Sequence, residues 1–258
     1  MILGLSWRRK QAPRKRLAID TDNTIIYAIG DVHGCYDELL ALEAKIVADA
    51  EEFEARKMII LLGDYVDRGK DTRRVLDHLL GLPPAGFERI CLAGNHDVAM
   101  LDYIEGRLGR ERWLAYGSDE TLFSYGLDAA HLAHLYDFAG VDRFIRANIP
   151  TEHVEFLRDL PVMAYSPKFV FVHAGVRSGV GLEQQSESDL MNIRDDESAV
   201  PRPGDRIVIH GHTRVGHPRR NGQVVGLETG VYETGQLTAL RIVGTQGRLI
   251  FSGPASEA

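Results

Sequence analysis

Five short polar clusters in the sequence place glycine beside aspartate, asparagine or histidine. Each follows directly after an apolar run that has the length and composition of a buried strand. The strand ends of an α/β sheet are where ligands collect, and glycine lets the backbone turn sharply there. The clusters are GDVHG at 30–34, GDYVDRG at 63–69, GNHD at 94–97, HAG at 173–175 and HGHT at 210–213. We therefore expect their side chains to meet at one place.

Each cluster taken alone has an ordinary structural explanation. An Asp-x-His can be a turn beside a hydrogen-bonded histidine, and Gly-Asn-His-Asp can be a helix N-cap. Five strand ends that supply carboxylate, amide and imidazole groups, with no cysteine among these groups, are hard to explain by capping alone. Together they predict a metal centre. Their donor types favour Mn, Fe or Zn over Ca or a thiolate-bound ion.

The five clusters, in this order, resemble the motifs of the metallophosphoesterase superfamily. Within it, VDRG in the second cluster is similar to the phosphoprotein phosphatase family of Ser/Thr phosphatases. SYG at 124–126, HVEFLRDLP at 153–161, LEQQSESDLMNIRD at 182–195 and TGQLTAL at 234–240 are similar to its bacterial branch. The likeness extends over residues 25–243 and implies two divalent metal ions bridged by one carboxylate. The ligands that it implies are Asp31, His33, Asp64, Asn95, His173 and His212.

The resemblance also implies roles around the ions. Asp64 would bridge the two ions, which can hold an attacking hydroxide when they lie about 3.5–4 Å apart. Arg68 and Arg194 would bind phosphate oxygens, because a guanidinium matches two of them at once. His96 would donate a proton to the leaving group, with its ring oriented by Asp67. A loop arginine paired with Asp67 and a structural histidine are the alternative interpretations of Arg68 and His96.

Three positions depart from the family pattern. Asn192 stands where bacterial relatives usually have tryptophan, two residues before Arg194. Glu228 stands in LETG where aspartate is usual, and Arg214 follows HGHT where proline is usual. The first departure bears on the phosphate role of Arg194, and the other two concern local structure.

The resemblance favours a Ser/Thr protein phosphatase that acts on a phosphoprotein or a small phosphoester. A symmetrical dinucleoside polyphosphate hydrolase, acting for example on diadenosine tetraphosphate, is the alternative, because one fold and one metal site serve many phosphoesters. Relatives of that class typically have asparagine where this chain has Asp67. A third possibility is a binding protein without activity, which would be expected to have lost ligands or the phosphate arginine. None is lost here.

Strand and helix patterns alternate in the first half of the chain, which predicts an α/β core with right-handed crossovers. The second half is mostly helical in pattern over 98–160 and then rich in short strands. We therefore expect a two-sheet β-sandwich flanked by helices, which the resemblance equates with the calcineurin-like metallophosphoesterase fold. Strands are expected at 24–29, 58–62, 89–93, 162–165, 169–172, 206–209, 224–227, 237–243 and 249–251, and helices at 36–57 and 72–80.

The chain of 258 residues suits one domain with a substantial core. Residues 1–16 carry six basic side chains and no acidic one, so the rest is more acidic than the net charge of −7. We expect residues 1–23 to form a disordered basic arm and residues 24–258 to form a single metallophosphoesterase domain. An acidic domain argues against a general nucleic-acid binder.

Membrane and export signals do not appear in the sequence. No apolar run approaches the roughly 20 residues that span a bilayer, and the first residues lack a signal-peptide pattern. Cys35 and Cys91 are too few for a disulfide framework, so buried free thiols are expected. These observations favour a cytoplasmic protein.

Overall fold

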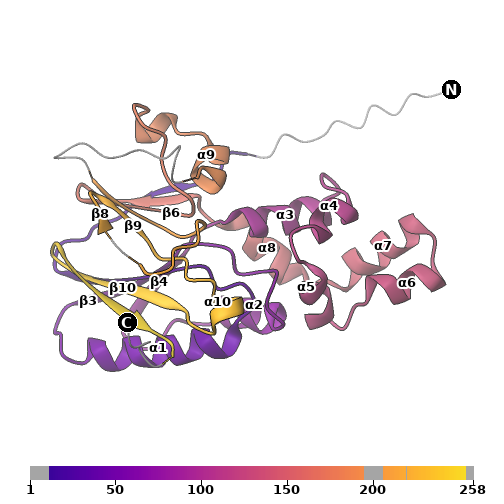
Figure 1. Ribbon diagram of the computed structural model, residues 1–258, viewed down its shortest axis with the longest axis horizontal. Coiled ribbons are helices and arrows are strands. Elements are labelled where there is room, and N and C mark those ends of the chain that lie inside the picture. Colours follow the sequence, from indigo (N-terminus) through magenta and orange to yellow (C-terminus); the bar gives the residue numbers. More distant parts are fainter. Residues whose placement is uncertain (1–11, 195–205, 219, 254–258) are drawn as a thin grey trace.

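The computed structural model describes residues 12–194, 206–218 and 220–253. Two mixed sheets lie face to face, with α1 (Tyr36–Ala50) under the outer face of one sheet and a lobe of helices at one end of the sandwich (Figure 1). The expected α/β architecture of two sheets flanked by helices is therefore confirmed.

The first sheet has five strands in the order β11-β10-β2-β3-β4. Its three neighbours β2, β3 and β4 are parallel, and α1 and α2 (Thr72–Leu80) connect them. Because parallel strands end at the same edge of a sheet, the polar clusters that follow these three strands are brought together. The strands are β2 (Thr24–Ile29), β3 (Arg56–Leu61), β4 (Phe87–Cys91), β10 (Thr238–Val243) and β11 (Gln246–Phe251).

The second sheet has six strands in the order β1-β5-β6-β7-β9-β8. Its central strands β6 and β7 are parallel, so His173 and His212, which follow them, lie at one edge. The strands are β1 (Arg16–Ala18), β5 (Met163–Tyr165), β6 (Phe169–Val172), β7 (Ile207–His210), β8 (Arg220–Asn221) and β9 (Val224–Gly226).

Strand β2 shows why the apolar runs are continuous. Ile26 and Ala28 pack between the sheets, whereas Ile25, Tyr27 and Ile29 pack against the helices. Since successive side chains of a strand point to opposite faces and both faces are covered, every position from Ile25 to Ile29 is buried and apolar.

The segment between the two sheets is helical, as expected, and forms the lobe in Figure 1. In its interior the buried Trp113 stacks on Tyr103, with ring centroids 4.5 Å apart. Its helices are α3 (Asn95–Ile104), α4 (Arg110–Leu114), α5 (Asp119–Ser124), α6 (Ala129–Leu135), α7 (Phe138–Asn148) and α8 (Thr151–Asp159). Later in the chain follow the short helices η1 (Leu182–Gln184), α9 (Glu187–Asn192) and α10 (Val231–Thr234).

The N-terminal boundary expected at residue 23 is wrong for the described part of the arm. Strand β1 pairs with β5 in parallel, and the buried guanidinium of Arg14 donates to the carbonyl oxygens of Leu157 and Leu160, both at 2.9 Å. Arg14, which was expected to lie in a disordered arm, thus donates hydrogen bonds to carbonyl groups at the end of α8. Residues 1–11 lie outside the described part of the chain.

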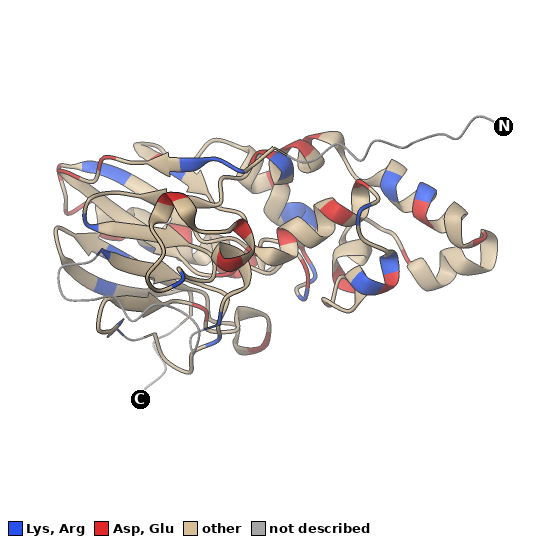
Figure 2. Ribbon diagram, turned by 90° about the horizontal axis from the view of Figure 1, so that it is seen from above, with Lys and Arg blue, Asp and Glu red and all other residues tan. Residues whose placement is uncertain are grey.

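Basic and acidic residues both lie on the strands and on the helical lobe in the view of Figure 2. Within residues 12–194, 206–218 and 220–253, no helix has both the length and the apolar character needed to cross a bilayer.

Candidate metal centre

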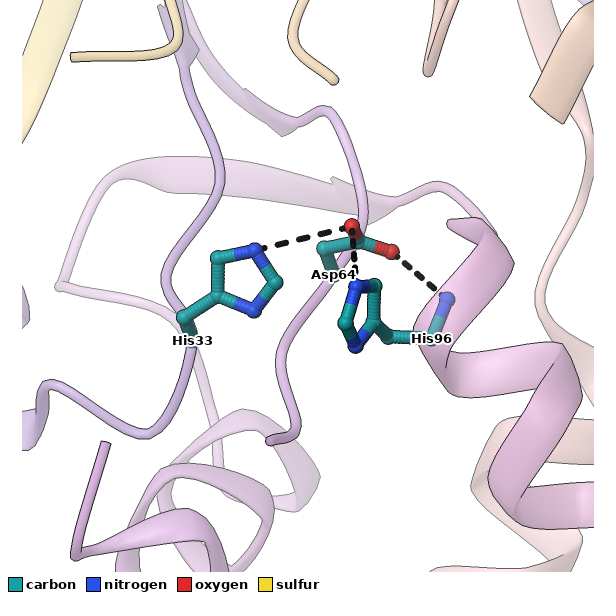
Figure 3. A group of neighbouring side chains, drawn as sticks. All are labelled: His33, Asp64 and His96. Carbon is teal, nitrogen blue, oxygen red and sulfur yellow. Dashed lines mark hydrogen bonds and ion pairs between the residues drawn. The ribbon is translucent and has the colours of Figure 1, made fainter. Parts of the chain in front are cut away.

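Asp64, which follows β3, lies at the centre of the converging clusters. Its Oδ2 is 3.6 Å from Nε2 of His33, 3.4 Å from Nε2 of His173 and 3.9 Å from Nε2 of His96. Figure 3 shows the rings of His33 and His96 on two sides of this carboxylate. Two donor atoms that each lie about 2.0–2.2 Å from one ion are separated by roughly 3–3.6 Å. Asp64 and its two nearest histidines have the spacing of atoms that share ions.

A second group of donors lies on the other side of Asp64. Nε2 of His173 is 3.0 Å from Oδ1 of Asn95 and 3.2 Å from Nδ1 of His212. Oδ1 of Asp31 lies 3.8 Å from Nδ1 of His173, and Oδ2 of Asp31 accepts the backbone N–H of His212 at 3.0 Å. The structure therefore brings the six predicted ligands to one place. Asp64 is common to two possible ion-binding groups, His33 with Asp64 and His96, and Asp64 with His173 and His212. Asp31 belongs to neither group and lies beside His173 and His212.

Backbone carbonyls orient two of the histidines. Nδ1 of His33 lies 2.9 Å from the carbonyl oxygen of Val66, and Nδ1 of His173 lies 2.9 Å from that of Leu62. A proton on each Nδ1 would be donated to that carbonyl, which leaves the Nε2 lone pair free to face Asp64. This second hydrogen bond is the usual support of a metal-binding histidine.

The buried side chains of the cluster have pKa values that are shifted in both directions. Asp31 and Asp64 are 1% and 2% exposed, and burial raises the pKa of Asp31 well above its ordinary range. Burial lowers the pKa of His33 to about 3, and burial together with His173 lowers the pKa of His212 to about 4. Burial also acts to lower the pKa of His173, but Asp64 and Asp31 outweigh it and raise that pKa to about 10. Buried carboxylates beside His33 and His212, which burial keeps neutral, are a donor set that fits divalent cations, and a bound cation would replace the proton that His173 holds.

Backbone strain is concentrated at this cluster. Six non-glycine residues of the described chain have positive φ, and all but Asn23 belong to the polar clusters. Such conformations cost on the order of 1–3 kcal/mol each and persist only where the surroundings impose them. The five are His33 (φ 43°), Asp64 (51°), Asp67 (68°), Arg68 (69°) and His212 (58°).

Two glycines allow neighbouring loops to approach the carboxylates. A Cβ atom on Gly94 would overlap the side chain of Asp64, and one on Gly211 would overlap that of Asp31. The glycines in GNHD and HGHT are thus required by close packing against the ligands themselves.

Asp97 was missed as a site residue by sequence reasoning. Its buried carboxylate accepts the backbone N–H groups of Asp64 at 2.8 Å, Tyr65 at 2.9 Å and Gly94 at 2.9 Å. It therefore joins the loop after β3 to the start of α3, the two segments that carry Asp64 and Asn95. The available signal was its place three residues after Gly94, where an acidic side chain can cap a helix.

His96 lies beside the donors and contacts the predicted orienting residue. Its Nδ1 is 2.8 Å from Oδ2 of Asp67, and its Nε2 is 3.2 Å from a guanidinium nitrogen of Arg68. Burial acts to lower the pKa of His96, but Asp64 and Asp67 outweigh it and raise the pKa. The same Nε2 is close enough to Asp64 and His33 to act as a ligand, so geometry alone permits either role.

A cavity of about 530 Å³ opens in front of the cluster. Arg68 and Arg194, the predicted phosphate ligands, both line it, together with Tyr116 and Tyr232. The hydroxyl of Tyr232 accepts a hydrogen bond from Arg68 at 2.6 Å, and the guanidinium carbon lies 4.7 Å from the centre of the tyrosine ring. Sequence reasoning missed Tyr232 because it lies on the short helix α10, outside the five clusters.

The model of the calcineurin-like phosphoesterase family matches residues 25–216. The chain belongs to this family. It is 27% identical over 233 residues to the bis(5'-nucleosyl)-tetraphosphatase PrpE (asymmetrical) of Anoxybacillus flavithermus, covering 83% of this chain and 88% of that protein. The superfamily predicted from the clusters is confirmed.

Solved structures support the same fold. One, provisionally described as a diadenosine tetraphosphatase, is 19% identical with a TM-score of 0.62 and covers 92% of this chain and 98% of that chain. A protein serine/threonine phosphatase from Saccharomyces cerevisiae is 17% identical with a TM-score of 0.53 and covers 93% of this chain and 83% of that chain. At these identities the likeness shows the fold alone. The phosphoesterase class and metal binding are supported, and the substrate is left to a proposal.

Proposed function

We propose that the protein is a two-metal phosphomonoesterase of the Ser/Thr protein phosphatase type, in which His96 protonates the leaving oxygen. The observation that supports this is the contact of 2.8 Å between His96 and Asp67, with Nε2 of His96 on the side of the cavity. A serine or threonine oxygen leaves as a poorly stabilised alkoxide and needs a proton in the transition state. A positioned donor supplies roughly 10²–10⁴ in rate for such a step.

The six predicted ligands would hold two divalent ions, with Mn favoured and Fe or Zn as alternatives. When bound, such ions activate the attacking water and draw charge from the phosphoryl oxygens. Asp64 is proposed as the bridging carboxylate because it belongs to both donor groups. The ligands are Asp31, His33, Asp64, Asn95, His173 and His212.

The remaining work falls to side chains of the cavity. Arg68 and Arg194 would bind the phosphate oxygens, and Tyr232 would hold Arg68 against the cavity wall before substrate arrives. Asp67 would keep the His96 ring oriented and favour its protonated form. The contacts that hold Arg68 and His96 exist before the substrate binds, which is the condition under which electrostatic contacts contribute most.

Asymmetrical hydrolysis of dinucleoside tetraphosphates is the second candidate, and the name of the Anoxybacillus relative favours it. In that reaction the leaving group is a nucleotide phosphate, which departs with little need of a proton. A donor built like His96 with Asp67 would contribute less there. The tyrosine rings of Tyr116 and Tyr232 in the cavity wall could contact a nucleobase.

One set of assays separates the two candidates. Purified protein with Mn²⁺ is given a phosphoserine peptide, para-nitrophenyl phosphate and diadenosine tetraphosphate, and the products of the last are separated by chromatography. A monoesterase cleaves the peptide with the higher kcat/KM. A tetraphosphatase of the asymmetrical type yields ATP and AMP, and one of the symmetrical type yields ADP alone.

The variant His96→Asn tests the proton donor. We expect it to slow the peptide reaction by roughly 10²–10⁴ and the para-nitrophenyl reaction much less, since para-nitrophenolate leaves without a proton. His131→Asn, on the exposed side of α6, is the matched control and should behave as the parent. Equal losses of His96→Asn on both substrates would assign the ring to metal or phosphate binding instead.

A further inference from the structure

Thr121, in α5, makes hydrogen bonds to Asp67 and to Thr72 through its hydroxyl. Its side chain is fully buried, and its Oγ1 accepts the backbone N–H of Asp67 and donates to Oδ1 of Asp67, both at 2.9 Å. Oγ1 of Thr72 lies 3.1 Å away and must donate, because the single hydroxyl proton of Thr121 is already used. One proton and two lone pairs are thus all occupied.

Both ends of Asp67 are held by this one side chain. Asp67 is fully buried and has a φ of 68°, a conformation that a non-glycine residue adopts only under constraint. Thr121 binds its backbone and one carboxylate oxygen, and the other carboxylate oxygen contacts Nδ1 of His96. The carboxylate therefore cannot rotate without breaking a contact at one end.

Neighbouring residues of the helical lobe contact the same turn and the start of α2. The carbonyl oxygen of Gly117 accepts the backbone N–H of Arg68 at 2.9 Å, and Oγ of Ser124 accepts that of Arg73, in the first turn of α2, at 3.2 Å. The ring of Tyr116 meets the ring of His96 edge-on, with centroids 5.0 Å apart. The helical lobe in Figure 1 thus contacts the turn that carries Asp67 and Arg68 at several points, and Thr121 supplies the contact to the Asp67 carboxylate.

We infer that Thr121 is a positioning residue for proton donation, which it controls by fixing the Asp67 carboxylate against His96. The inference rests on the proposed function, since it assigns His96 a proton to donate. Without the hydroxyl, Asp67 loses the hydrogen bond that opposes its rotation, and the imidazole samples orientations that do not face the leaving oxygen. The rate should therefore fall for substrates whose leaving oxygen needs a proton, and much less for substrates whose leaving group does not.

The test compares two substitutions of nearly equal size. Thr121→Val removes the hydroxyl and keeps the shape, whereas Thr121→Ser keeps the hydroxyl and removes a methyl group. We expect Thr121→Val to lower kcat on a phosphoserine peptide roughly 10- to 100-fold, the loss of one hydrogen bond to a charged group, with KM little changed. Its kcat on para-nitrophenyl phosphate should stay within about threefold of the parent, and Thr121→Ser should restore the peptide rate.

A spectroscopic measurement is independent of turnover. In protein loaded with diamagnetic Zn²⁺, the Nδ1 proton of His96 should give a downfield resonance that is absent from His96→Asn. Thr121→Val should broaden or shift this resonance, and Thr121→Ser should not. If Thr121→Val does not fold, Thr121→Ala takes its place with the same expected pattern.

Two results would overturn the inference. One is a Thr121→Val enzyme whose losses are equal on both substrates, or absent, with an unchanged His96 resonance. The other is a Thr121→Ser enzyme as impaired as Thr121→Val, which would make the methyl group the important part. If the parent cleaves only diadenosine tetraphosphate, the proposed function fails, whereas the resonance still reports whether Thr121 fixes the Asp67–His96 contact.

Discussion

Asp97→Asn exchanges a single atom in a side chain that holds two loops of the metal centre together. Asp97 accepts three backbone N–H groups, from Tyr65 on Oδ1 and from Asp64 and Gly94 on Oδ2. Asparagine can place its oxygen where Oδ2 lies, which keeps an acceptor for Asp64 and Gly94, and its NH₂ group then takes the place of Oδ1. The N–H group of Tyr65 would then face a donor in a buried site, and the other two hydrogen bonds would lose their charged acceptor.

The magnitude follows from one lost acceptor and from two hydrogen bonds that lose a charged acceptor. Each hydrogen bond to a charged group contributes about 1.5–3 kcal/mol, roughly twice a neutral one. Part of that sum is returned, because burial and the charge of Asp64 raise the pKa of Asp97 to about 7 and so make its charge costly. We expect a loss of about 3–5 kcal/mol in the free energy of unfolding. Domains have about 5–15 kcal/mol in total, so the variant should fold but with a markedly lower melting temperature.

Urea unfolding followed by circular dichroism measures this loss, with and without Mn²⁺. Asp102→Asn on the same helix is the control, because its ion pair with the partly exposed Arg107 should contribute no more than about 1 kcal/mol. The Asp97→Asn variant should also bind metal more weakly, since Asp97 fixes the segments that carry Asp64 and Asn95. An unfolding free energy within about 1 kcal/mol of the parent would refute the view that Asp97 holds the two loops together.

Four other expectations can be checked directly. Asp64→Asn should abolish activity and release at least one metal ion, as seen by elemental analysis, because Asp64 belongs to both donor groups; two retained ions in an active variant would contradict this. Arg68→Ala should cost about 3–4 kcal/mol in kcat/KM, and kinetics within about threefold of the parent would make the residue structural. Cys35 and Cys91 are free thiols but only partly buried, not fully buried as expected; their partial burial raises the pKa of both to about 12, so they stay protonated at about pH 8 and iodoacetamide should label them much faster after unfolding. Deletion of residues 1–11 should leave turnover of a small substrate unchanged, whereas a deletion that also removes β1 should lower the melting temperature.

Sequence patterns located the elements that are apolar on both faces. The bounds of β2 and β6 were predicted to the residue, because each is a short run of buried side chains that ends in a polar cluster. The helix expected at 36–57 ends instead at Ala50, and residues 56 and 57 begin β3. The polar residues after Ala50 fit either the continuation of a helix or a loop that leads into a strand, and their composition does not distinguish these two structures.

The N-terminal strand shows where composition misleads. Arg16–Ala18 is a strand of three residues at a sheet edge. In the sequence, a short segment that follows several basic residues has the composition of a solvated tail. Its pairing with β5 depends on acceptors that come from distant segments, such as the carbonyl oxygens that bind Arg14 and Arg16. Partners of that kind are created by the fold and leave no local spacing to recognise.

The same reasoning explains why ligands were predicted and their supports were not. A ligand must be of one chemical type at the end of a particular strand, so its identity and position are both informative. A support such as Thr121 or Tyr232 is a common residue type at a position that only the tertiary structure makes special. Asp97 belongs to GNHD, but it binds backbone N–H groups of another cluster, which its place in the motif does not indicate. Yet five residues of positive φ, at on the order of 1–3 kcal/mol each, would relax without hydrogen bonds that hold them. The motifs therefore specify which atoms can bind the ions, whereas the geometry of those atoms depends on contacts from outside the motifs, chiefly from the helical lobe and α10.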